Sequence, residues 1–541
     1  MRFKFYCSDV FGLDKPSHVQ EKCIIICIIV LSIWSFPSNA YSQLDAQKED
    51  FLTISERLDL FDDLVAAARE NHYFSKNVEL NLGFQWENEL PKLKQEFADA
   101  SDKYELMNAI KHFQGSLHNV HCRYNVPDRP KTYELPFNVG SELSHDEWRF
   151  YIKKLNDQSL NGKIKLGDYI VTVDGISILE FIQMHIHDSW KETRQGVMQD
   201  LAYFIAHRSV PPDLPVEGKK SILEFKTRTT GNTYKLSFDW SVEKNKYESW
   251  PKYDPNTYKG LEPSKYGSYS IVERGQNFCV LMSNDPKYIS YPIIYFQSFS
   301  YCGGYEVNNM YTLGMESDYF ILKKWVSQSK NIKGLILDLR DNGGGNNPNY
   351  FLDWFAPNNY PGEYNSWILS ELLYNKRKDS TRPCDVWYDQ QYLNKKKEQK
   401  LSEKAPFFIY DDPNWDNVYT PKHRIFTYPI AILSGPKCVS SCDSFVLAFK
   451  ENRFGPIIGE PPASSYSNCS EYSIYTRKNK MYLGTIGFTE FKCTSGVNGE
   501  AIEGKLLEPD YPIYETFENK DVYDKLLVDK AIDALKSYKF H

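Results

Sequence analysis

Residues 334–345 constrain the fold of this chain more than any other stretch of it. An apolar run leads into Asp338 and Arg340 and then into three consecutive glycines. Apolar residues that end at a glycine cluster predict a buried strand followed by a sharp turn. Glycine also lets backbone N–H groups come close to a ligand, and such amides can hold an oxyanion. The stretch therefore predicts a core strand with an anion-binding loop at its end.

A second strand-to-helix junction follows about a hundred residues later. An apolar strand is expected at residues 428–433 and a helix at 443–451, with Ser440 and Ser441 between them. A hydroxyl at a helix N-terminus lies in a favourable field. The simplest alternative is that Ser440, Ser441 or Asp443 only caps the helix. Together the two junctions favour a serine hydrolase site.

Size and charge limit the class of protein. The chain has 541 residues, 41% hydrophobic and 25% charged, which is typical of a soluble globular protein with two to four domains. A net charge of −7 does not favour a nucleic-acid partner. Hydrophobic periodicity predicts a multidomain α+β chain with an N-terminal helical cap and an α/β core. The expected parts are a signal peptide at 1–40, a helical domain at 41–127, a β-rich domain at 128–245, an irregular insertion at 246–290, the core at 291–515 with an insertion at 350–425, and a C-terminal helix at 516–541.

The N-terminal segment resembles a secretory signal. An apolar run from Cys23 to Trp34 is followed by small residues up to Ala40, and it is shorter than the ~20 residues that span a bilayer. We therefore expect export to a periplasmic or extracellular space, with cleavage near Ala40. An uncleaved segment would instead anchor the chain to a membrane. Eight cysteines follow residue 40, and pairing of Cys438 with Cys442, Cys469 or Cys493 stays open beside buried free thiols.

The β-rich domain contains a short motif of its own. Residues 165–178 form a strand, an Asp-Gly turn and a second apolar run. This pattern resembles a segment of PDZ domains, which bind the C-termini of peptides by adding them as a strand. Residues 221–240 alternate like a hairpin that closes such a module.

The two junctions resemble the core of one peptidase family. The runs GLILDLRDNGGG and AILSGPKCVSSCDSFVLAFKENRFGPIIGEP are similar to C-terminal-processing (tail-specific) serine peptidases and to the tricorn core protease. The resemblance implies a crotonase-like core with a mixed sheet. It implies Ser440 as nucleophile, with Ser441 as the alternative. It also implies an oxyanion hole from the amides of Gly344, Gly345 and Ser441, and structural roles for Asp338, Arg340 and Asn342.

Departures from the family pattern indicate which branch is closest. Where the Ser-Lys branch has its lysine, this chain has Ser465. The tricorn-like branch uses a histidine base in an L-x-D-x-H stretch, and His121 matches it, with Asn119 in place of the acid and Val120 in place of a hydroxyl residue. Glu503 matches the acid that supports such a site. Imidazole suits proton transfer near neutral pH.

These expectations combine into a serine endopeptidase that cleaves unfolded or peptide-end-bearing polypeptides through Ser440, His121 and Glu503. No cofactor, metal or nucleic acid is expected, and the partner is the polypeptide substrate. One alternative is a binding protein on a retired peptidase fold, which the substitutions at Asn119, Val120 and Ser465 favour. Another is an esterase or amidase that uses the same site.

Overall fold

The computed structural model describes residues 51–144, 147–242, 261–301, 313–345, 347–380, 383–396, 398–406, 418–478 and 480–538. The expected signal segment at 1–40 lies outside these ranges.

Four helices form the N-terminal cap, as the apolar periodicity predicts. They are α2 (Ile54–Asn71), α3 (Lys76–Leu82), α4 (Trp86–Asp99) and α5 (Lys103–Gly115). Thr53 and Glu56 form a reciprocal capping box that starts α2. Phe97 and Phe113 are fully buried beside Phe61 and join α4 and α5 to α2.

The PDZ-like domain, residues 128–242, is built on a sheet in the order β2-β3-β4-β7-β8, with β5 paired to β4. Asp174 and Gly175 both have positive φ, 52° and 85°, which is the turn that an Asp-Gly pair favours between antiparallel strands. Both predicted hairpins are confirmed. The strands are β1 (Lys131–Glu134), β2 (Phe137–Ser144), β3 (Glu147–Leu155), β4 (Tyr169–Val173), β5 (Ile176–Ser177), β6 (His207–Val210), β7 (Lys220–Lys226), β8 (Thr233–Asp239) and β9 (Ser241–Val242).

This domain also contains helices that the strand-rich pattern did not predict. They are η2 (Gln158–Leu160), α6 (Ile178–His185), η3 (Ile186–Asp188) and α7 (Arg194–Ala206). Ser177 and Thr193 cap α6 and α7 by accepting backbone N–H groups with their hydroxyls. Helix α7 packs against β2.

The core is a mixed seven-stranded sheet in the order β10-β11-β12-β13-β18-β19-β23. Its first three strands pair antiparallel and the rest pair parallel. The strands are β10 (Tyr269–Arg274), β11 (Phe278–Ser283), β12 (Ile293–Phe296), β13 (Leu335–Asp338), β18 (Ile430–Ser434), β19 (Ile457–Gly459) and β23 (Tyr511–Pro512).

Residues 269–283 correct one expectation. The sequence predicts an irregular insertion at 246–290, whereas these residues form the hairpin β10–β11 at the edge of the core sheet. Tyr and charged residues on β10 hide its alternation, because its outer face is exposed while Tyr269 is buried. The hairpin follows η4 (Pro263–Tyr266).

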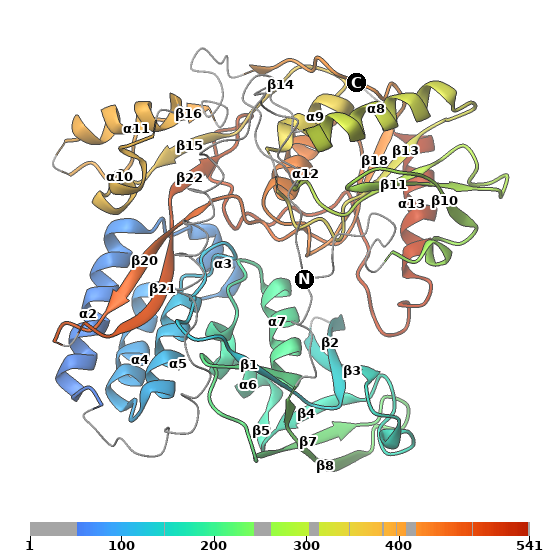
Figure 1. Cartoon of the computed structure of the whole chain (residues 1–541). Helices are drawn as coiled ribbons and strands as arrows, with labels where there is room; N and C mark the ends of the chain where they lie inside the picture. The colour runs from blue at the N-terminus through green and yellow to red at the C-terminus, as the bar shows by residue number, and fades with distance from the viewer. Residues whose placement is uncertain are drawn as a thin grey trace, which may run out of the picture. The chain divides into compact units, whose positions relative to one another are not determined.

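Helices cover both faces of the core sheet. Alternate strand residues point to opposite faces, so Leu335 and Leu337 pack with α8 (Leu313–Gln328), α9 (Pro348–Phe355) and α12 (Ser441–Glu451). Ile336 points the other way and packs with α13 (Tyr523–Ser537). This arrangement places the carboxyl ends of β13 and β18 side by side (Figure 1).

The remaining elements link the core to the cap. Strands β20 (Cys469–Tyr475) and β21 (Tyr482–Thr489) form a hairpin whose second strand contacts α2 and α5 (Figure 1). The other elements are β14 (Tyr360–Pro361), β15 (Tyr364–Trp367), α10 (Glu371–Arg377), α11 (Pro383–Leu393), β16 (Ala405–Pro406), β17 (Val418–Tyr419) and β22 (Phe491–Thr494).

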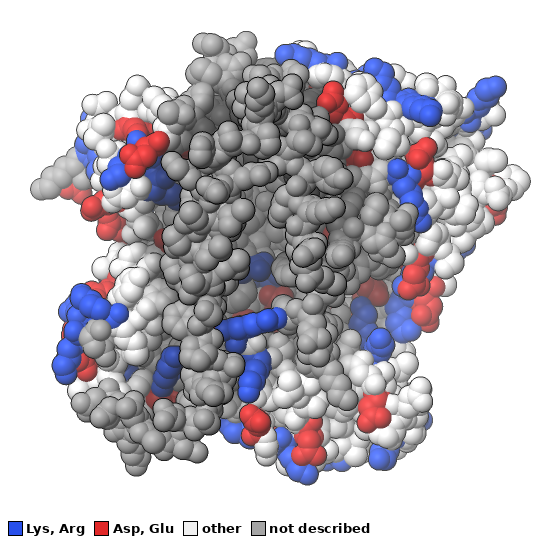
Figure 2. All heavy atoms as spheres, in the orientation of Figure 1, with Lys and Arg blue, Asp and Glu red and all other residues white. Residues whose placement is uncertain are grey.

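Among the described residues, no helix has the length and apolar character needed to cross a bilayer. On the face drawn in Figure 2, acidic and basic side chains lie next to one another over the described surface.

Candidate active site

Ser440 stands on a strained turn between β18 and α12. Its φ of 64° and ψ of −124° lie in a region that residues with a β-carbon rarely adopt. Such strain persists only where the surroundings enforce it, and it gathers at functional sites. A serine on a sharp strand-to-helix turn is the arrangement that presents a nucleophile in hydrolases.

Asp443 holds this turn in place. Its fully buried carboxylate accepts the Ser440 N–H at 2.9 Å. The same carboxylate accepts the N–H groups of Ser464 at 2.8 Å and Ser465 at 3.1 Å. Burial raises the pKa of Asp443 well above its usual range. The Ser440 N–H is also directed at the Ser465 carbonyl, 3.1 Å away. The serine turn and the 464–465 segment are therefore joined through one carboxyl group.

The glycine loop after β13 lies directly against Ser440. A β-carbon added at Gly344 would lie 2.5 Å from the Val439 carbonyl oxygen and 2.8 Å from the Ser440 β-carbon. Gly344 and Gly345 have φ of 84° and 138°, which glycine adopts without strain. The close approach explains why the chain has glycine at 344.

The amides near Ser440 differ in their hydrogen bonds. The Gly344 N–H donates to Asn342 Oδ1 at 2.9 Å, and the Gly345 N–H donates to Ser441 Oγ at 3.2 Å. The Ser441 hydroxyl in turn donates to the Gly345 carbonyl at 2.9 Å. Within the described ranges, the Ser441 N–H has no acceptor. The Ser441 hydroxyl is thus hydrogen-bonded to the glycine loop, whereas the Ser441 N–H is available to bind another acceptor.

His121 follows helix α5 and lies next to Ser465. Its Nδ1 is 3.0 Å from Ser465 Oγ, and the carbonyl of that residue accepts the Ser440 N–H. Ser465 therefore connects the candidate base to the turn of the candidate nucleophile. Burial, with added repulsion from Arg123 and Lys191, lowers the pKa of His121 to about 4. The imidazole is consequently neutral at pH 7.

Glu503 supports the loop that carries His121 rather than the imidazole ring. Its buried carboxylate accepts Asn119 Nδ2 at 2.8 Å and the N–H groups of Tyr466 and Ser467, each at 2.9 Å. Asn119 Oδ1 accepts the backbone N–H of His121 at 3.0 Å. In the described part of the chain, no hydrogen bond joins Glu503 to the His121 ring. Burial raises the pKa of Glu503 to about 7.

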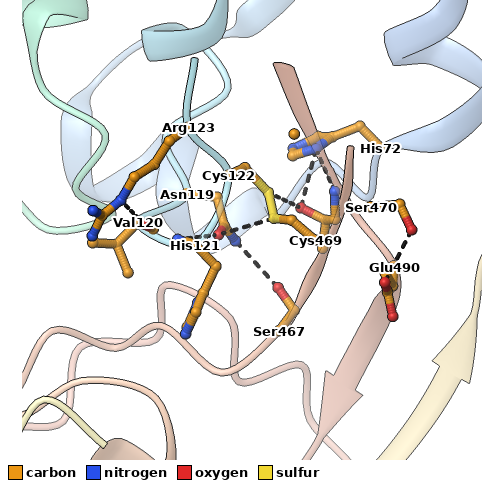
Figure 3. The surroundings of a disulfide bond; sticks show 12 residues. His72, Asn119, Val120, His121, Cys122, Arg123, Ser467, Cys469, Ser470 and Glu490 are labelled. Atoms are coloured by element: carbon orange, nitrogen blue, oxygen red, sulfur yellow. Dashed lines mark hydrogen bonds between the residues drawn. A yellow bond between two sulfur atoms is a disulfide. The ribbon is translucent and has the colours of Figure 1, made fainter. Parts of the chain in front are cut away.

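Two disulfides flank the site. Cys122, directly after His121, is bonded to Cys469 at the start of β20, and Figure 3 shows this bond beside Asn119. Cys438 is bonded to Cys442 and brackets Ser440. The cysteines at 279, 384 and 493 are buried. The pairing of Cys438 with Cys442 is one of the alternatives that the sequence left open.

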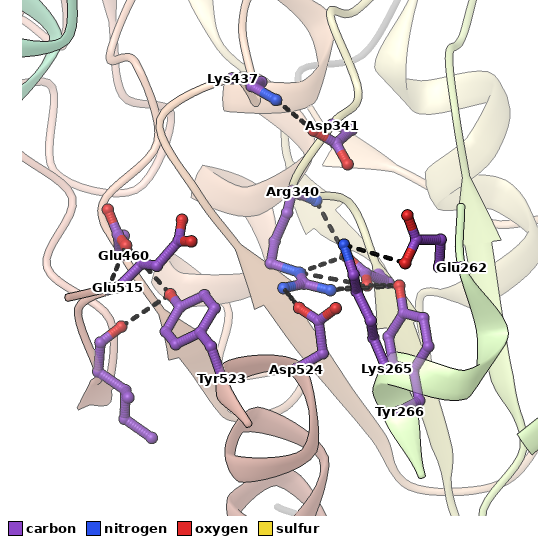
Figure 4. Close-up of polar contacts among 12 residues, drawn as sticks. Glu262, Lys265, Tyr266, Arg340, Asp341, Lys437, Glu460, Glu515, Tyr523 and Asp524 are labelled. Carbon is purple, nitrogen blue, oxygen red and sulfur yellow. Dashed lines mark hydrogen bonds and ion pairs between the residues drawn. The ribbon is translucent and has the colours of Figure 1, made fainter. Parts of the chain in front are cut away.

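Asp338 and Arg340 anchor the base of the glycine loop. Arg340 Nη2 lies 2.6 Å from the fully buried Asp338 carboxylate, and Arg340 Nη1 lies 2.5 Å from Asp524 on α13. The Tyr266 hydroxyl donates to Asp338 at 2.6 Å. Figure 4 shows the Arg340 guanidinium between Tyr266 and Asp524. Their role is to fix the loop to the sheet and to α13.

Glu192 is a site residue that no pattern in the sequence indicated. It lies 72 positions from Val120, and its Oε1 accepts the Val120 N–H at 2.9 Å. Ser465 was recognised only as a departure from the Ser-Lys pattern, and its contact with His121 depends on the tertiary fold. No group of three or more His, Cys, Asp or Glu side chains in the described regions is arranged to hold a metal ion.

A groove of about 450 Å³ lies between β2 and α7 on one side and the core on the other. Its lining includes Gly140 and Gln195 from the PDZ-like domain and Arg340, Lys437 and Tyr523 from the core. Ser440 is not part of the lining.

Part of the sequence and the fold of the chain are similar to those of known proteins. Residues 316–513 match the sequence profile of peptidase family S41. The crystal structure of mature CPAF is similar, with a TM-score of 0.65 and 16% identity over 90% of this chain and 99% of that chain. Mature CPAF complexed with lactacystin gives a TM-score of 0.63 and 16% identity over 89% and 98% of the two chains. The photosystem II D1 C-terminal processing protease aligns at a TM-score of 0.37 and 13% identity over 88% and 98%. At sequence identities this low, the comparisons with solved structures show a similar fold only. No curated protein sequence matches the chain.

Proposed function

Because residues 316–513 place the chain in peptidase family S41, it is a serine-type peptidase, and we propose that it cleaves polypeptides through an acyl-enzyme on Ser440. The observation that supports this most is the strained Ser440 turn, joined to the His121 ring through Ser465.

The proposed reaction begins with attack of the Ser440 hydroxyl on a peptide carbonyl. His121 takes the hydroxyl proton through Nε2, because Nδ1 faces Ser465. The carbonyl oxygen becomes an oxyanion, which the open Ser441 amide can receive. His121 then returns the proton to the leaving amine. Water hydrolyses the acyl-enzyme by the same steps, with His121 removing its proton.

The glycine loop would supply the second oxyanion donor. The Gly344 amide lies against Ser440 but donates to Asn342, and the Gly345 amide donates to Ser441. One of these amides would exchange its side-chain acceptor for the oxyanion. Such bonds commonly tighten or rearrange only when the substrate is bound.

The departures from the family pattern also fit an active site. Asn119 supplies the N–H hydrogens that an aspartate would lack, so it can donate to Glu503 and still accept from the His121 backbone. Ser465 contacts the His121 ring where a lysine stands in other members. These contacts favour a peptidase over a retired binding protein.

Export is the second part of the proposal. Disulfides persist in oxidising compartments, and the bonds Cys122–Cys469 and Cys438–Cys442 support secretion of the chain. The signal-like segment at 1–40 is the expected route. Unfolded polypeptides are the proposed substrate, held in the groove beside β2 and α7.

Replacement of the nucleophile tests the proposal. Ser440→Ala should abolish cleavage of reduced, alkylated casein. Ser444→Ala, in the first turn of the same helix, is the matched control and should retain cleavage. Wild-type activity in Ser440→Ala would remove Ser440 from the mechanism.

A further inference from the structure

The hydroxyl of Ser441 contacts both backbone groups of one glycine in the loop after β13. Its oxygen accepts the Gly345 N–H at 3.2 Å, and its hydrogen is donated to the Gly345 carbonyl at 2.9 Å. The proposed reaction uses neither bond, because Ser440 is the nucleophile and the backbone N–H of Ser441 is the oxyanion donor. The side chain of Ser441 therefore makes a contact at the reaction centre that the mechanism does not explain.

Gly345 is better placed than Gly344 to meet the substrate oxygen. Gly345 is exposed, whereas Gly344 is buried. The Gly344 N–H donates at 2.9 Å to Asn342, which is fully buried. The backbone of Asn342 is itself fixed, because its N–H donates to Leu339 and its carbonyl accepts the Val439 N–H. The bond from the Gly344 N–H is therefore enclosed, and the Gly345 N–H is the amide that a bound substrate can reach.

The direction of the Gly345 N–H is fixed by the other side of the same peptide group. The carbonyl of that group belongs to Gly344, and it accepts the Phe299 N–H at 2.9 Å and the Ser298 hydroxyl at 3.2 Å. In a trans peptide the carbonyl and the N–H point in opposite directions. The Gly345 N–H therefore points away from residues 298–299 and toward the N-terminus of α12, where Ser441 lies.

The oxygen of Ser441 thereby occupies the place that an oxyanion needs. An oxyanion hole made of two amides requires one oxygen to lie within reach of both N–H groups. Ser441 Oγ accepts the Gly345 N–H, and it belongs to the same residue as the second amide, so it lies close to both donors. A substrate oxygen must displace this hydroxyl before it can accept the Gly345 N–H.

We infer that the Ser441 hydroxyl is a latch that keeps the oxyanion hole closed until a substrate carbonyl displaces it. The inference rests on the proposed function of Ser440. Rotation of the Ser441 side chain to another staggered rotamer opens the latch without movement of the backbone. The glycine loop keeps its shape meanwhile, because its bonds to Ser298, Phe299 and Asn342 do not involve Ser441. The closed latch lowers the reactivity of Ser440 toward weakly bound carbonyls.

Removal of the hydroxyl tests the latch, because Ser441→Ala leaves both amides in place. The Gly345 N–H then no longer has to exchange the hydroxyl for the oxyanion. We expect kcat on casein to rise about fivefold with KM nearly unchanged, which is the size of the contribution of one neutral hydrogen bond. The rate at which a fluorophosphonate labels Ser440 should rise by the same factor, since its phosphoryl oxygen uses the same donors.

Ser444→Ala is the matched control, since it removes a hydroxyl one turn further along α12. Its kcat and its labelling rate should equal those of the wild type. Ser441→Thr keeps the hydroxyl and should be no faster than the wild type. If Ser441→Ala does not fold, Ser441→Gly also removes the hydroxyl and takes its place in both measurements.

Unchanged or slower cleavage and labelling in the folded Ser441→Ala or Ser441→Gly chain would overturn the latch, because the hydroxyl would then only support the loop. Equal acceleration in Ser441→Thr and Ser441→Ala would also overturn it, since the threonine retains a hydroxyl. Failure of the proposed function gives a different result: Ser440→Ala would retain cleavage, and Ser441→Ala would abolish it if Ser441 were the nucleophile.

Discussion

At the scale of single residues, Asn119 shows how a departure from a family pattern can be compensated. Its amide both donates to Glu503 and accepts from the His121 backbone, which an ionised aspartate could not do. The sequence showed the substitution but not its partner, because the two residues are 384 positions apart.

Asn119→Asp should therefore be harmful at neutral pH. The new carboxylate would face Glu503, whose pKa of about 7 is already raised by burial, and like charges disfavour joint ionisation. At pH 7 we expect kcat/KM of the variant to be about tenfold lower than that of the wild type, the factor that 1.4 kcal/mol represents. The difference between the two proteins should become smaller as pH falls below 7. Steady-state assays on casein across pH measure this.

Asn125→Asp is the control, since Asn125 donates to Glu471 in an exposed position. Equal losses in the two variants, or a loss that deepens at low pH, would contradict this reading of Asn119.

Glu192 could not be predicted from the sequence. Ser440 and the glycines could be found because strand, turn and helix signals surround them locally. Glu192 has no local signal, since its partner Val120 is set by the packing of α7 and the cap. Its contact with Val120 could therefore be found only from the tertiary structure.

At the scale of elements, buried charges join the cap to the PDZ-like domain. Asp188 of η3 lies against Lys111 and His112 of α5, and His112 also contacts Glu96 of α4 at 2.7 Å. Burial alone would lower the pKa of His112, but the charge of Asp188 and hydrogen bonds to Asp188 and Glu96 raise it to about 9.

This interface should weaken at alkaline pH. A folded pKa of about 9 exceeds the unfolded value near 6.5, so the folded chain binds more protons between these values. The stabilisation is complete below pH 6.5 and is lost as pH rises through 9, by at most about 3 kcal/mol. Thermal unfolding at several pH values should show this decline in the wild type and a smaller one in His112→Gln. Parallel curves for the two proteins would contradict the assignment.

The elements also show which signals in the sequence were sufficient. The Asp-Gly turn and the strand before the glycines were predicted because their patterns are local. Helices α6 and α7 were missed because apolar residues on both faces of a packed helix blur its periodicity. The hairpin β10–β11 was missed because its edge strand is half exposed and rich in tyrosine and charge.

At the scale of the described chain, the PDZ-like domain is attached to the core around the groove. Arg228 donates to Glu142 at 2.7 Å and to the Gly167 carbonyl at 2.9 Å, and it also contacts Glu518 and the Phe517 ring of the core.

Arg228→Ala should affect long substrates selectively. Removing the guanidinium loosens the contact that positions β2 beside the core, but it leaves Ser440 and His121 in place. We expect kcat/KM for casein to fall on the order of tenfold, with hydrolysis of a small activated ester unchanged. Arg149→Ala, whose described contacts stay within the PDZ-like domain, should leave both activities near wild type. Equal losses on both substrates would show that the groove does not guide polypeptides.

The central claim is that Ser440 is an activated nucleophile served by His121. The most direct measurement is reaction of the purified chain with a fluorophosphonate, followed by mass spectrometry of the labelled peptides. The account predicts one adduct, on Ser440, that is absent in Ser440→Ala and forms much more slowly in His121→Ala. An adduct on another residue, or equal labelling rates in wild type and His121→Ala, would contradict it.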